Sequence, residues 1–148
     1  ENCSYTLEVK TGKIIFSLSE IGAGTSNAVH VKFRNKTGSQ VVKKHLNKEM
    51  EGKKFQAGKT DTFQFSGACL EGRICLLNFF VEGKDRWGPQ CATVKGGSLK
   101  EPYTFHFRRH LPQKAWDGQN TCDYDEEVPS TLSTMISIKR KFSIVKFM

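Results

Sequence analysis

The sequence predicts an all-β protein built as an antiparallel β-sandwich, and three observations lead to this prediction. Apolar and polar residues alternate over several short segments, as they do in strands that bury one face. Segments rich in Gly, Asn and Asp separate these runs and are typical of turns. No long stretch of the sequence repeats apolar residues with the period of a helix. Many short strands separated by turns favour a sandwich.

The first strand is predicted at residues 5–12, "YTLEVKTG", where Tyr5, Leu7 and Val9 share one face. The same alternation predicts three further strands, at residues 28–35, 60–67 and 102–110. Residues 73–81, "RICLLNFFV", are apolar almost throughout. A strand of this kind is expected near the middle of a sheet, where both of its faces are covered.

We expect one domain, residues 1–122, followed by an acidic linker and a basic, apolar tail in residues 123–148. The tail suits a lipid-surface segment, an additional packed strand or a disordered end, and the sequence leaves these three open. No apolar run approaches the ~18 residues of a membrane span. The chain opens on polar residues without an initiator Met, from which we expect a mature, processed form.

The chain is basic, with 23 Lys and Arg against 15 Asp and Glu and a formal net charge of +8. This balance favours anionic partners such as acidic lipid headgroups, sulfated glycans or nucleic acid, although a basic surface without a specific partner is equally common. Nucleic acid is the least favoured partner, because the basic residues are not interleaved with exposed aromatic residues on a strand. The strongest candidate for an anion-binding surface is one basic cluster: Lys43, Lys44, His45, Lys48, Lys53 and Lys54.

The five cysteines point to disulfides rather than to metal binding, because none forms a C-x-x-C pair or clusters with His. The sequence does not settle how they pair. We favour Cys69–Cys75 and Cys3–Cys122, with Cys91 free or buried. Together with the N-x-S/T sequons at Asn2 and Asn35, this predicts a secreted, extracellular glycoprotein. The alternative is a cytosolic protein with five reduced thiols.

The sequence carries no recognisable catalytic motif, whether a G-x-S-x-G elbow, a P-loop or H-E-x-x-H. The G-K-T at residues 58–60 lacks the upstream glycine of a P-loop, and a predicted strand follows it instead of a helix. We therefore expect a binding module rather than an enzyme, and no cofactor beyond a weak calcium site.

Several segments, taken in order, resemble the PLAT/LH2 domain of lipoxygenases, lipases and polycystin-type membrane proteins. They are "YTLEVKTG", "GAGTSNAVHVKF", "FQAGKTDTFQF", "GRICLLNFF" and "GKDRWGPQCATVK", which together cover about Ser4 to Lys95. Two more motifs, "GACLEGRIC" and the more specific "LPQKAWDGQNTC" of Leu111–Cys122, are similar to the secreted, stand-alone plant PLAT proteins of the embryo-specific (ATS3-type) group. The resemblance implies a sandwich of about eight strands.

The resemblance also bears on calcium, because PLAT domains that bind it use loop residues, among them an Asp after the G-T that precedes the second strand. Ser26 stands there in this chain, and a neutral hydroxyl is a poor replacement for a carboxylate. Asn27 and Asp61 remain as possible ligands of a weak calcium site. The interpretation that we favour for Asp61 is plainer: an acceptor that ties its turn to a backbone N–H.

The resemblance implies a non-catalytic module that contacts membrane lipid or a protein partner. We expect the basic cluster and Trp116 to make this contact, with Trp116 either at a loop tip that enters the lipid interface or over an open end of the sandwich. Trp87 is expected to pack in the core. Two alternatives stay open: binding of a sulfated, heparin-like glycan through the same lysines, and service as an accessory domain for a lipid-processing enzyme.

Overall fold

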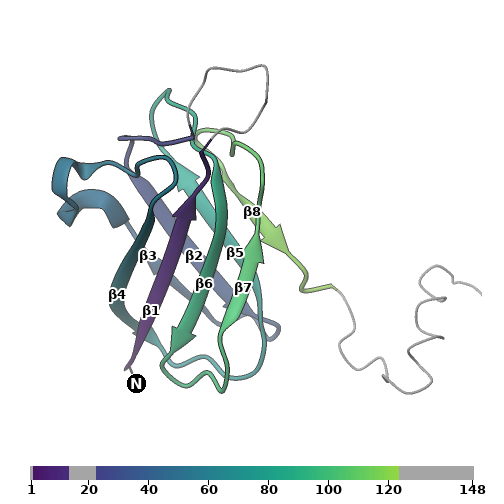
Figure 1. Cartoon of the computed structure of the whole chain (residues 1–148). Coiled ribbons are helices and arrows are strands. Elements are labelled where there is room, and N and C mark those ends of the chain that lie inside the picture. Colours follow the sequence, from purple (N-terminus) through teal and green to yellow (C-terminus); the bar gives the residue numbers. More distant parts are fainter. Residues whose placement is uncertain (1, 14–22, 124–148) are drawn as a thin grey trace, which may run out of the picture.

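The computed structural model describes residues 2–13 and 23–123, so the predicted tail beyond Asp123 lies outside the described residues. Within these ranges the chain forms eight strands and two short 3-10 segments, η1 and η2 (Figure 1). No helix in this part of the chain is long and apolar enough to cross a membrane. The elements are β1 Asn2–Thr11, β2 Val29–Asn35, β3 Gln40–Lys43, η1 Leu46–Glu49, η2 Glu51–Lys53, β4 Thr60–Ala68, β5 Ile74–Val81, β6 Pro89–Gly96, β7 Tyr103–His106 and β8 Trp116–Asn120.

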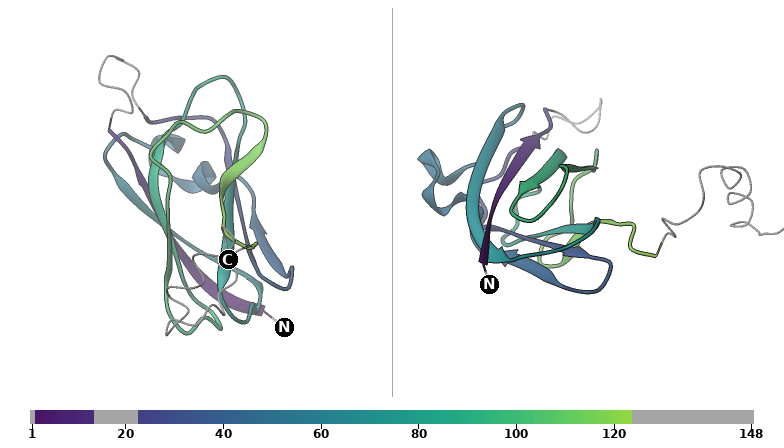
Figure 2. Two further views of the ribbon diagram at one scale, coloured as in Figure 1. Left: turned by 90° about the vertical axis from the view of Figure 1, so that its right-hand side faces the viewer. Right: turned by 90° about the horizontal axis from the view of Figure 1, so that it is seen from below.

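The strands form two four-stranded sheets that face each other, which confirms the predicted antiparallel sandwich (Figures 1 and 2). The first sheet has the order β4-β1-β6-β7 and the second has the order β3-β2-β5-β8, and every neighbouring pair is antiparallel. Strand β1 runs along the whole length of β4, from Asn2 opposite Ala68 to Lys10 opposite Thr60. This register defines two ends of the sandwich: one where β1 begins and one where it ends.

The core lies between the sheets and is made by the alternation that the sequence shows. Tyr5, Leu7 and Val9 of β1 are fully buried, and the apolar strand β5 lies inside the second sheet as expected. Trp87 is fully buried between the rings of Phe55 and Phe79, each with its centroid 4.9 Å away. The core role predicted for Trp87 is therefore confirmed.

The structure differs from the predicted strands at their edges. β7 ends at His106, whereas the alternation predicts a strand to residue 110. The reason is local: Arg108 has φ 56°, a left-handed conformation that interrupts an extended strand. The edge strands β3 and β8 were not predicted, because each is short and neither alternates clearly between apolar and polar residues.

The disulfides join Cys3 to Cys69 and Cys75 to Cys122, so the predicted pairing of Cys69 with Cys75 and of Cys3 with Cys122 is wrong. Cys69 and Cys75 are close in sequence but belong to different sheets, since Cys69 follows β4 and Cys75 lies in β5. Cys69 pairs with Cys3 of β1 and Cys75 with Cys122, which follows β8, so each partner belongs to the same side of the sandwich, with Cα atoms 5.0 and 4.8 Å apart. Cys91 is unpaired, as expected.

Candidate functional site

The six basic residues of the predicted cluster occupy one continuous segment between β3 and β4, which we call the basic segment. Its five lysines are exposed and His45 is half-buried. The two 3-10 segments give it its shape, and it projects from one edge of the sandwich (Figure 1). The structure therefore keeps the predicted cluster in one exposed segment, in which the five lysines outnumber the two acidic residues, Glu49 and Glu51.

Asn47 fixes the basic segment to the sandwich. Its side chain is fully buried, although asparagine is usually exposed. The amide group donates to the carbonyls of Asn27 at 2.8 Å and Lys53 at 3.1 Å, and its Oδ1 accepts the N–H of Val29 at 3.1 Å. Because both donors and the acceptor are used, the lysines extend from an ordered support rather than from a loose loop.

An aromatic face lies on the outer side of the second sheet, and we define it as His30, Lys32, Phe80 and Trp116. The register aligns His30, Phe80 and Trp116 across β2, β5 and β8. The rings of His30 and Phe80 are 5.8 Å apart, and those of Phe80 and Trp116 are 5.5 Å apart at 61°. The ammonium group of Lys32 lies 4.5 Å from the centre of the Trp116 ring, within cation–π range.

His30 joins the aromatic face to the basic segment. The backbone N–H of His45 donates to Nδ1 of His30 at 2.7 Å, so this nitrogen carries no proton. The proton of the neutral ring is therefore on Nε2, which donates to Oε2 of Glu82 at 2.5 Å. This hydrogen bond holds the pKa of Glu82 below its usual value. The two surfaces are thus continuous through one hydrogen-bonded imidazole.

Trp116 takes neither of its predicted places at a loop tip or over an open end of the sandwich. It is the first residue of β8 and lies half-buried on the sheet face, where Phe80 and Lys32 contact it. Sequence reasoning missed Lys32, Phe80 and Asn47. The alternation of 28–35 places Lys32 on the solvent side, but nothing local in the sequence indicates that β8 pairs with β5 beside it.

Asp61 borders a hollow of about 230 Å³ next to the basic segment, lined by Met50, Glu51, Lys54, Gln56, Lys59 and Asp61. Partial burial raises the pKa of Asp61, and the charge of Lys59 opposes this effect. Its Oδ2 is buried and has no hydrogen-bond partner among the described residues. Oδ2 therefore does not make the expected bond to a backbone N–H. Backbone bonds close the turn instead, from Gly58 N–H to the Thr11 carbonyl at 3.0 Å and from Lys59 N–H to the Gln56 carbonyl at 3.1 Å.

The three residues proposed for calcium do not assemble into a recognisable metal site. Ser26 is exposed, and Asn27 uses its amide N–H to reach the carbonyl of Asp85 at 2.8 Å. In residues 2–13 and 23–123, no group of three or more His, Cys, Asp or Glu side chains could hold a metal. Calcium binding stays a prediction of the sequence.

The two sequons differ in what their side chains do. Asn2 is exposed at the start of β1. Asn35 is only 3% exposed, and its Nδ2, where a glycan would attach, donates to the carbonyl of Glu71 at 3.0 Å. Its Oδ1 accepts from the Thr37 hydroxyl and the Ser39 N–H. A glycan would replace one hydrogen of this nearly buried Nδ2, which has little room for it beside the Glu71 carbonyl, so of the two predicted acceptors Asn2 is the better suited to the folded chain.

Comparison with known proteins places this chain in a family. Residues 1–122 match the family described as embryo-specific protein 3 (ATS3). The embryo-specific protein ATS3 of Arabidopsis thaliana is 31% identical over 124 residues, which cover 82% of this chain and 54% of that protein. The lipoxygenase homology domain-containing protein 1 of Homo sapiens is 29% identical over the same length, which covers only 6% of that protein. The chain thus spans about half of the first relative and a small part of the second.

Solved structures show the same architecture. A lipoxygenase crystal structure superposes with a TM-score of 0.64 at 19% identity, over 95% of this chain and 20% of that one. The coral 8R-lipoxygenase, whose title describes calcium activation through a C2-like domain, gives a TM-score of 0.63 at 20% identity, over 91% of this chain and 20% of that one. The fold and the relatives define a PLAT/LH2 domain, a class of lipid- or protein-binding modules. Within this class, the chain belongs to the embryo-specific protein 3 (ATS3) family.

Proposed function

We propose that this chain is a secreted, non-catalytic module that binds the anionic surface of a membrane through the basic segment and the aromatic face. One observation carries the proposal: the His45–His30 hydrogen bond makes five exposed lysines continuous with the Phe80–Trp116 pair. Membrane-surface proteins combine cationic side chains, which attract acidic headgroups, with amphipathic aromatic rings at the interface.

The two surfaces contribute differently to binding. Each lysine near an acidic membrane contributes about 1 kcal/mol, so removal of three lysines weakens binding by roughly 100-fold. Salt screens this part of the attraction. Trp116 contributes apolar contact that salt does not screen. Binding should therefore fall steeply with ionic strength but keep a residual part that depends on Trp116.

The secreted location rests on the four paired cysteines. Disulfides persist in oxidising compartments and are rare in the cytosol. Cys3–Cys69 and Cys75–Cys122 support export of the chain, and the exposed sequon at Asn2 is consistent with it.

Co-sedimentation with vesicles tests this proposal. The chain should sediment with vesicles that contain phosphatidylserine and stay in solution with purely zwitterionic ones. The variant Lys43→Ala/Lys44→Ala/Lys48→Ala should lose most of this binding. A matched control of equal charge, Lys10→Ala/Lys95→Ala/Lys100→Ala, removes lysines of the first sheet and its loop and should bind nearly as the wild type does.

Three further arms separate the alternatives. Trp116→Ala should abolish the residual binding at high salt, whereas Trp116→Phe should keep part of it. Addition of EDTA to the binding reaction shows whether calcium contributes. Heparin that binds more tightly than acidic vesicles and resists high salt would favour the sulfated-glycan function. Equal loss of vesicle binding in both triple variants would refute a localised surface.

A further inference from the structure

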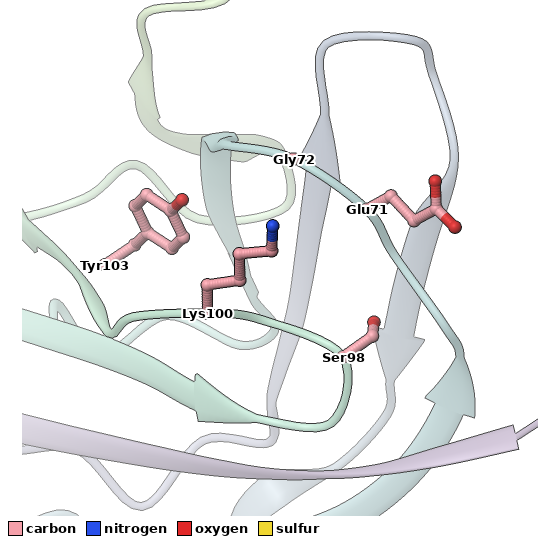
Figure 3. A pocket seen from close by; sticks show the side chains of 5 residues that line it. All are labelled: Glu71, Gly72, Ser98, Lys100 and Tyr103. Carbon is pink, nitrogen blue, oxygen red and sulfur yellow. The ribbon is translucent and has the colours of Figure 1, made fainter.

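A second hollow, of about 470 Å³, lies at the other end of the sandwich, where β1 begins. Its volume falls in the range of about 300–1,000 Å³ typical of small-molecule sites. It opens between the turn after β4 and the turn after β6 (Figure 3). Glu71, Gly72, Ser98, Lys100 and Tyr103 line it.

The wall formed by residues 69–75 is held at both ends. Cys69 is joined to Cys3 and Cys75 to Cys122, so the short connection between them is attached to both sheets. Between the two disulfides, Leu70 is fully buried and its N–H donates to the Tyr5 hydroxyl at 2.9 Å. A wall fixed in this way loses little conformational freedom when a ligand binds.

The opposite wall is tied to the first one. The hydroxyl of Ser98 donates to the Leu70 carbonyl, which leaves its lone pairs to accept a further hydrogen bond. The turn that carries Ser98 depends on Gly97, whose φ is 59° and whose hydrogen faces the Tyr5 ring. A Cβ at Gly97 would lie 2.5 Å from that ring, so only glycine lets this turn approach so closely.

The side chains around the hollow balance in charge. Lys100 supplies one positive charge and Glu71 one negative charge, and neither forms an ion pair with another residue of the described part of the chain. In Figure 3, Lys100 lies between the Tyr103 ring and Ser98, while the Glu71 side chain points away from Lys100 at the rim of the hollow. The hollow therefore offers strong donors and acceptors on opposite sides and one aromatic ring, without the cationic excess of the basic segment.

We propose that this hollow binds a neutral saccharide. Each sugar hydroxyl both donates and accepts, so one ring can bond to the Lys100 ammonium and the Ser98 oxygen, with the Glu71 carboxylate at the rim. The apolar face of a pyranose ring matches the aromatic surface of Tyr103. An acidic headgroup or sulfate does not suit a site whose charges cancel, so this site is distinct from the membrane surface proposed above.

NMR titration of the ¹⁵N-labelled chain with glucose, galactose, mannose, xylose, lactose and cellobiose tests the proposal. At least one sugar should shift the amide signals of residues 70–73 and 97–103, with a Kd on the order of 1–10 mM. Glu71→Ala and Lys100→Ala should each weaken binding about tenfold, because each removes a charge-assisted hydrogen bond. Tyr103→Leu should abolish it while keeping an apolar side chain at the strand, and Tyr103→Phe should retain most of it.

A variant outside the hollow provides the control. Lys48→Ala, in the basic segment, should leave sugar binding unchanged. The proposal is overturned if no sugar of the panel shifts these amides up to about 50 mM, several times the expected Kd. It is equally overturned if Glu71→Ala and Lys100→Ala bind as the wild type does, or if glycine shifts the same amides and the sugars do not. Vesicle binding is unaffected by any of these results, so the two proposals fail independently.

Discussion

Removal of the disulfides one at a time tests the pairing and the energetics of the fold together. Cys3–Cys69 closes a loop of 66 residues and Cys75–Cys122 one of 47. The chain-entropy relation then gives about 4 kcal/mol of stabilisation for each bond. The pairs Cys3→Ala/Cys69→Ala and Cys75→Ala/Cys122→Ala should therefore lower the free energy of unfolding by similar amounts.

Denaturant unfolding measures these losses, and thiol titration in denaturant reads the pairing directly. With the pairing of the structure, Cys3→Ala/Cys69→Ala retains the Cys75–Cys122 bond and exposes one thiol, that of Cys91. With the pairing favoured from sequence, each variant removes one cysteine from both bonds, so Cys3→Ala/Cys69→Ala exposes three thiols: those of Cys75, Cys91 and Cys122. A count of three thiols in Cys3→Ala/Cys69→Ala would refute the structural assignment.

Three further predictions follow from buried groups. Burial raises the pKa of Asp61, so the folded state binds the proton of this carboxyl group more tightly than the unfolded state does. The free energy of unfolding should therefore fall as pH rises above 3.8, the ordinary pKa of Asp. Denaturant unfolding of Asp61→Asn from pH 3 to 7 should lack this fall. Asn47→Ala strands three backbone groups and should cost about 2–4 kcal/mol in chemical denaturation, and it should also weaken vesicle binding; a loss below about 1 kcal/mol contradicts its anchoring role. Gly97→Ala should lower Tm by several degrees in calorimetry, since its Cβ meets the Tyr5 ring, and an unchanged Tm contradicts the close approach.

Much of the sandwich could be predicted from sequence, because a strand that buries one face has apolar residues at every second position. The strands β1, β2 and β4 alternate in this way, and β5 is recognised instead by its almost continuous apolar run. The edge strands β3 and β8 show neither pattern, since half of their contacts are with solvent and their residues are chosen for the surface. Because β8 was not predicted, the position of its first residue, Trp116, on the sheet face was not predicted either.

The candidate site was predictable in part for a similar reason. The basic segment is contiguous in sequence, so its charge is visible without a structure. The aromatic face combines residues from β2, β5 and β8, and the bond between His45 and His30 joins it to the segment, so both depend on strand register. The predicted disulfide pairing was wrong for the same reason, because spacing along the chain does not show that Cys69 and Cys75 belong to different sheets.

The order of the disulfides along the chain determines how the protein responds to proteolysis. The two covalent loops, 3–69 and 75–122, follow each other without overlap. A single cut inside either loop, including one by a trypsin-like protease at the exposed lysines of the basic segment, leaves both fragments joined through sulfur. Within residues 3–122, only a cut between Cys69 and Cys75 separates the chain into two pieces, and that connection is the one whose ends are both anchored. The basic segment can thus be cut at its exposed lysines while the two fragments stay covalently joined until the disulfides are reduced.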